Sequence, residues 1–238
     1  MKMLLMVVFL ISGVSLKADE EKSIRVFVAL CDNATQGIVK VGEKIGNGDD
    51  PEGNLYWGCD DGLASYFKRS SKWKTVDAVK NPAPGILRRL KFRHADGGLV
   101  LTADAYRGAE MKKCLLDFEA AVASKEHALV AFIGHNGFME LQLPKPKPVE
   151  NNPTATIALC CLSESYFTPR LERMSSEPLL LTRQLMYPGS FILHDAIESW
   201  RKGGNRTAIR SAAGRAYAKN QKISVRAGTG IFADLEAK

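Results

Sequence analysis

The chain has 238 residues, of which 45% are hydrophobic and 25% are charged, and its formal net charge is +7 at pH 7. These proportions are ordinary for a globular protein and exclude a disordered or fibrous chain. The length is sufficient for one domain with a substantial hydrophobic core, and the sequence shows no internal repeat and no second domain.

The chain begins with the pattern of an export signal. After Lys2, residues 3–16 are almost entirely apolar, and the sequence then becomes charged. An apolar run of this length is too short for a membrane-spanning helix, which needs roughly 20 residues. We therefore expect a signal peptide at residues 1–18 and a single secreted or periplasmic domain at residues 19–238. The alternative is an uncleaved N-terminal anchor, and no later stretch has the length of a transmembrane segment.

The mature chain is expected to begin between Leu16 and Asp19 and to be recovered outside the cytoplasm. N-terminal sequencing of the secreted or periplasmic fraction checks this expectation. Recovery of Met1 on membrane-bound protein would show an anchor instead of a cleaved signal.

Expected strands and helices alternate along the domain. The strands are expected at residues 24–31, 86–93, 99–103, 128–133 and 156–160, and the helices at 60–69, 108–124, 191–202 and 206–219. Dense β-branched or apolar runs indicate the buried strands, and apolar residues at helical spacing indicate the helices. Such alternation predicts a three-layer α/β sandwich with a mostly parallel, doubly wound sheet.

The positive charge is concentrated near the C-terminus. Between Glu198 and Asp234 the chain has no acidic residue, and its basic residues there are Arg201, Lys202, Arg206, Arg210, Arg215, Lys219, Lys222 and Arg226. This basic C-terminal region predicts contact with an acidic surface, and a solvated helix face is the alternative. Nucleic acid is not expected as a partner, because the region lacks interleaved aromatic residues.

The chain has five cysteines, namely Cys31, Cys59, Cys114, Cys160 and Cys161. In an oxidising compartment an odd number leaves at least one thiol unpaired, unless it pairs between chains. The sequence leaves the pairing open. An unpaired thiol is a candidate reactive group.

Two expected strands end in residues that can do chemistry. One ends at Gly134, His135 and Asn136, and the other ends at Cys160 and Cys161. In open parallel sheets, ligands bind at the carboxyl ends of the strands. A cysteine and a histidine at this edge predict nucleophilic catalysis, in which a thiolate attacks a carbonyl and the imidazole transfers protons. The alternatives are a structural histidine and a cysteine that serves as a small buried residue.

A strand ending in histidine and glycine, followed by one ending in cysteine with serine two residues later, is typical of the caspase, legumain and gingipain group of cysteine peptidases. His135 matches the first element, and Cys161 with Ser163 matches the second. The resemblance covers residues 24–165 and implies a caspase-like fold. The segments RVFVALCDN and NLYWGC also resemble bacterial exported proteins of no assigned activity.

Three features depart from the group's pattern. Asn136 stands between His135 and Gly137, only 25 residues separate His135 from Cys161, and Cys160 precedes the expected nucleophile where the group often has alanine. A disulfide between Cys160 and Cys161 would inactivate the site.

The resemblance implies an exported cysteine peptidase or amide hydrolase that acts on a peptide or protein. Cys161 would form a thioester, and His135 would protonate the leaving amine. The N–H groups of Cys161 and of the turn at Asn136 and Gly137 would bind the oxyanion. This chemistry requires no metal and no organic cofactor.

Three further residues are expected to line the cleft, namely Ser163, Asp104 and Arg183, and the alternative for Asp104 and Arg183 is a loop residue in an ordinary ion pair. Asp104 follows an expected strand end. Cys59 is the rival nucleophile, since it precedes an expected helix whose dipole would lower its pKa. The main alternative function is a non-catalytic, peptidase-like scaffold that binds a partner or an envelope component.

Overall fold

The computed structural model describes residues 21–236 as one α/β unit, so the expected signal peptide at residues 1–18 lies outside the described residues. The strands are β1 (Lys22–Ala29), β2 (Trp73–Ala83), β3 (Ile86–His94), β4 (Leu99–Tyr106), β5 (Leu129–Ile133), β6 (Ala155–Leu159) and β7 (Glu177–Leu180). The helices are α1 (Leu63–Arg69), α2 (Met111–Ser124), α3 (Ser163–Arg173), α4 (Ser190–Arg201), α5 (Arg206–Gln221) and α6 (Val225–Gly230), with 3₁₀ turns η1 (Gly108–Glu110) and η2 (Gly137–Met139).

The seven strands form one sheet in the order β2-β3-β4-β1-β5-β6-β7. The pairs from β4 through β7 are parallel, and β2 and β3 extend the sheet through antiparallel pairs. The expected mostly parallel α/β sheet is therefore confirmed, with an antiparallel hairpin added at one side.

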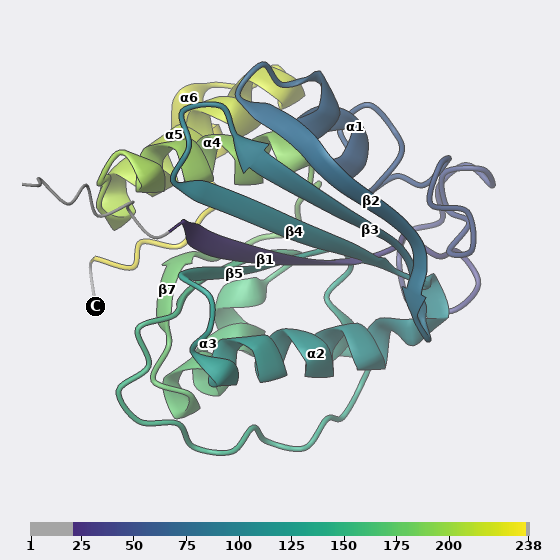
Figure 1. Cartoon of the computed structure of the whole chain (residues 1–238), viewed down its shortest axis with the longest axis horizontal. Helices are drawn as coiled ribbons and strands as arrows, with labels where there is room; N and C mark the ends of the chain where they lie inside the picture. The colour runs from purple at the N-terminus through teal and green to yellow at the C-terminus, as the bar shows by residue number, and fades with distance from the viewer. Residues whose placement is uncertain (1–20, 237–238) are drawn as a thin grey trace, which may run out of the picture.

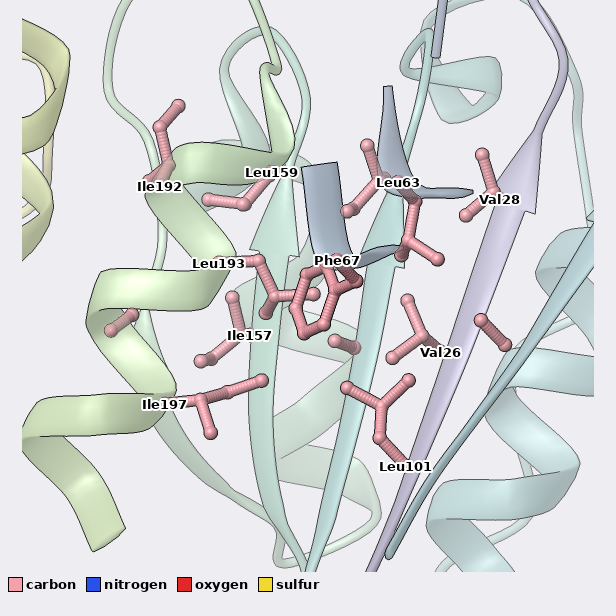
Figure 2. Packing of buried hydrophobic residues seen from close by; sticks show 14 of the residues in the cluster. Val26, Val28, Leu63, Phe67, Leu101, Ile157, Leu159, Ile192, Leu193 and Ile197 are labelled. Carbon is pink, nitrogen blue, oxygen red and sulfur yellow. The ribbon is translucent and has the colours of Figure 1, made fainter. Parts of the chain in front are cut away.

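Helices cover both faces of the sheet and make three layers (Figure 1). α1, α4, α5 and α6 lie on one face, and α2 and α3 lie on the other. Each face buries its own apolar cluster. In the first cluster, Phe67 of α1 and Leu193 of α4 pack over Ile157 of β6 (Figure 2). The buried strands are apolar on both sides because helices exclude water from both faces.

Several elements were not expected from the sequence. These are β2, which pairs with β3, the helix α3 that begins just after Cys161, the short strand β7, and the final helix α6. The expected strand at residues 99–103 continues to Tyr106. Within residues 21–236, no helix has both the length and the apolar character needed to cross a membrane.

Candidate active site

The register of β5 and β6 places His135 and Cys161 at the same level of the sheet. Ile133 pairs with Leu159 at the carboxyl ends of these neighbouring parallel strands. His135 and Cys161 each follow two residues later, where both chains leave the sheet. The structure thus brings the two expected catalytic residues to adjacent strand ends.

The alternation of side chains along β6 distinguishes the two vicinal cysteines. Leu159 belongs to the cluster beneath α1 and α4, where Figure 2 shows it beside α4. Cys160 points to the opposite face and is completely buried in the cluster with α2 and α3. Cys161 is half-buried, and its sulfur lies beside Met186, which packs against the first cluster.

Asn136 ties the two strand ends together. Its Nδ2 donates a hydrogen bond of 2.7 Å to the carbonyl oxygen of Cys161. Its Oδ1 accepts a hydrogen bond of 3.2 Å from the N–H of Phe138. The residue that departs from the peptidase pattern therefore has a structural role, because it fixes the histidine loop against the cysteine loop.

His135 is nearly buried, and one of its ring nitrogens is committed. Nε2 lies 2.7 Å from Oε1 of Glu140, which also accepts a hydrogen bond of 2.8 Å from the N–H of Gly37. Nδ1 forms no hydrogen bond with any residue in the described part of the chain. Glu140 was not expected from the sequence, although it lies only five residues after the histidine.

The sulfur of Cys161 is held by the backbone of Met186. The N–H of Met186 donates to Sγ at 3.4 Å, and the thiol donates to the Met186 carbonyl at 3.6 Å. Burial raises the pKa of Tyr56, and negative charge on Cys31 or Cys161 raises it further. Tyr56 therefore stays protonated. Among residues 21–236, the thiol of Cys161 and the imidazole of His135 form no direct hydrogen bond.

The other four cysteines are poor nucleophiles. Burial raises the pKa of Cys31 to about 11, and it also raises the pKa values of Cys114 and Cys160. The pKa of Cys59 is raised by burial and by the charge of Asp60, which disfavours it as the nucleophile. All five thiols are free, and the disulfide between Cys160 and Cys161 is not formed.

The amide groups near the strand ends show which donors can bind an oxyanion. The N–H of Gly137 donates to the carbonyl oxygen of His135 at 3.0 Å, so this donor is already used. The N–H groups of Cys161 and Asn136 have no acceptor among residues 21–236. Of the donors expected from the sequence, these two remain available.

Ser163 and Asp104, two of the residues expected to line the cleft, have their polar groups committed to structural contacts. Ser163 is completely buried at the start of α3, where Oγ donates to the Ala158 carbonyl at 2.8 Å and accepts from the Thr182 N–H at 2.8 Å. The side chain of Arg183 is exposed, and its N–H donates to the Ile231 carbonyl. The expectation for Ser163 is therefore wrong, because it holds the start of a helix.

Asp104 does not follow the end of a strand, as the sequence had suggested. It lies within β4, and its side chain has no exposed surface. Arg89 donates to it through two nitrogens, each at 2.7 Å, and Arg25 forms a second ion pair with it. Both oxygens of its carboxylate are bonded to these arginines, so Asp104 does not line a catalytic cleft.

Two surface cavities are present, and neither is lined by His135 or Cys161. One, of about 910 Å³, lies at the amino edge of the parallel strands and is lined by Lys22, Leu99 and Glu177 among others. The other, of about 560 Å³, lies beside α3 and includes Phe138 and Arg170. Neither cavity is lined by a cysteine or a histidine.

The basic C-terminal region contains two kinds of cation. Arg201, Arg206 and Arg210 form ion pairs with acidic residues. The others are exposed and form no ion pair within residues 21–236: these are Lys202, Arg215, Lys219, Lys222 and Arg226. The expected basic surface is thus confined to these residues.

Fold and site together define an α/β protein with a cysteine and a histidine at the carboxyl edge of a mostly parallel sheet. Comparisons with protein-family models, curated proteins and solved structures give no match to the chain.

Proposed function

We propose that this protein is an exported cysteine peptidase or amide hydrolase with a caspase-like fold, in which His135 and Cys161 act together. The observation that carries the proposal is their position at the same level of two paired, parallel strands. Asn136 ties the two loops together. Cys161 is also the partly exposed thiol whose strand end adjoins that of His135.

The proposed reaction is acyl transfer. The Cys161 thiolate attacks the carbonyl carbon of the scissile amide, and the C–N bond breaks as His135 gives a proton to the leaving amine. The resulting thioester is hydrolysed by a water molecule that gives a proton to His135. The N–H groups of Cys161 and Asn136 stabilise the oxyanion, and such a donor typically contributes about 3 kcal/mol. The sequence of steps needs no metal or organic cofactor.

Cys161 is expected to be the thiol that is alkylated fastest near neutral pH. The imidazole of His135 can accept its proton, and the Met186 N–H can stabilise the thiolate. The measurement is mass spectrometry of the folded mature protein after brief treatment with iodoacetamide.

Cys59 provides the internal control, since it is also half-buried but has a raised pKa. Preferential labelling of Cys59, with Cys161 inert, would show that Cys161 at the strand end is not the nucleophile.

A second candidate function is a peptidase-like scaffold without catalysis that binds an acidic partner or envelope component. The exposed, unpaired cations of the basic C-terminal region favour it. We propose that Lys219, Lys222 and Arg226 carry any contact with an acidic surface, because they lie close together in the chain, at the end of α5, just after it and at the start of α6. A scaffold of this kind has no need of a reactive Cys161, so the alkylation measurement separates the two functions.

A further inference from the structure

We propose that Glu140 is a positioning residue for His135, and that it makes Nδ1 the ring nitrogen that exchanges protons with Cys161. The inference rests on the proposed function of the His135 and Cys161 pair and adds to it the residue that orients the imidazole. Nothing in the resemblance to cysteine peptidases assigns a role to this glutamate.

The first step of the argument is the chemistry of the bond between His135 and Glu140. An ionised carboxylate can only accept hydrogen bonds, so Nε2 must carry the proton in the contact of 2.7 Å. In a neutral imidazole the other nitrogen then carries the lone pair. Nδ1 has no hydrogen-bond partner among residues 21–236 and is therefore the nitrogen available to the thiol.

The second step concerns how Glu140 itself is held. Its Oε1 accepts from the N–H of Gly37 at 2.8 Å, and Gly37 lies in the long loop that follows β1. A Cβ added to Gly37 would lie 2.0 Å from this same oxygen. Gly37 does not have the left-handed conformation that favours glycine, so alanine there is compatible with the backbone. The added methyl group would displace the flexible end of Glu140 and leave the rest of the loop in place.

Four variants test the proposal. Glu140→Ala removes the acceptor, Glu140→Gln keeps an acceptor oxygen but removes the charge, and Gly37→Ala displaces the carboxylate from outside. Gly42→Ala is the matched control in the same loop, since a Cβ there would meet only ordinary contact with Ile45 at 3.8 Å. Glu140 is over one-third exposed, so these changes are expected to leave the fold intact, as circular dichroism would verify.

The first measurement is the tautomer of His135, read from the ¹⁵N chemical shifts of its ring nitrogens. The spectra are recorded in a Cys161→Ala background at about pH 8.5, roughly two units above the usual histidine pKa. A parallel His135→Asn variant assigns the signals among the four histidines. We expect the Nε2–H tautomer in the parent, in Glu140→Gln and in Gly42→Ala, and a mixture of tautomers in Glu140→Ala and Gly37→Ala.

The second measurement is the rate at which iodoacetamide alkylates Cys161 in the otherwise native chain. We expect Glu140→Ala to slow it about 10-fold or more, by analogy with the 10- to 100-fold effects of residues that orient a metal-binding histidine. Gly37→Ala should give a smaller decrease, Glu140→Gln should recover part of the rate, and Gly42→Ala should match the parent.

The outcomes separate the role of Glu140 from the proposed function. An unchanged tautomer and an unchanged alkylation rate in Glu140→Ala would overturn the positioning role while leaving a reactive Cys161 in place. An inert Cys161 in the parent protein would overturn the His135 and Cys161 pair itself, and the positioning role with it.

Discussion

Replacing Cys161 by alanine is expected to abolish peptide cleavage, and His135→Ala should reduce kcat/KM by several orders of magnitude. The thiolate forms the covalent bond to the substrate, and the imidazole transfers protons in both halves of the reaction, a contribution that is typically about 10²- to 10⁴-fold. The assay is a fluorogenic peptide library with acidic, amide and basic residues before the scissile bond. A reducing agent keeps the thiol free.

The double variant provides the stricter test of a single working unit. If the two residues act together, Cys161→Ala with His135→Ala should be scarcely slower than Cys161→Ala alone, because groups that act as a unit are strongly non-additive. Each variant should keep the native fold, since neither change removes much buried apolar volume. Cleavage that survives Cys161→Ala undiminished would exclude the proposed nucleophile.

The strands that carry the candidate site were predictable because they are buried on both faces. β5 and β6 lie at the centre of the parallel part of the sheet, so the sequence there is a continuous apolar run that ends abruptly at His135 and Cys161. The expected fold placed both strand ends at the same edge of the sheet. The structure shows that β5 and β6 are neighbours and that Ile133 pairs with Leu159.

The elements that the sequence did not predict have weak local sequence patterns or depend on contacts between distant parts of the chain. β2 is exposed along nearly its whole length, so its sequence has no apolar alternation, and its pairing with β3 defines it. α3 is polar and contains Pro169 within its length, and β7 has only four residues. Glu140 is an ordinary loop carboxylate in the sequence. Its role emerges only because the chain brings Gly37 and His135 to the same oxygen atom.

Asp104 shows why one candidate site residue was assigned to the wrong role. The apolar part of the strand stops just before it, so the sequence suggested a residue beyond the strand end. The strand in fact continues to Tyr106, because two arginines neutralise the carboxylate within the sheet. Arg89 is its direct partner across the antiparallel pair with β3, and Arg25 reaches it from β1. Pairing of β4 with β3 and with β1 thus makes an apparent functional carboxylate a structural one.

Asp104→Ala is therefore expected to destabilise the fold strongly and to leave no specific catalytic defect in the protein that remains folded. Removing one partner of a buried ion pair leaves uncompensated charge, which typically costs about 3–5 kcal/mol. Arg25 is only 14% exposed, so its charge would be poorly solvated without the carboxylate, whereas Arg89 at 36% exposure would recover more of its hydration. The measurement is the free energy of unfolding from urea titration of the folded mature protein.

Asp60→Ala is the matched control for this prediction. Asp60 also pairs with an arginine, Arg69, but its side chain is 99% exposed, and exposed ion pairs contribute little to stability. Asp104→Asn adds a second comparison, because it keeps the shape of the side chain and an acceptor oxygen while removing the charge. A stability of Asp104→Ala indistinguishable from that of Asp60→Ala would contradict the structural role. If Asp104→Ala were as stable as the parent but had lost peptide cleavage, the result would show that Asp104 takes part in catalysis.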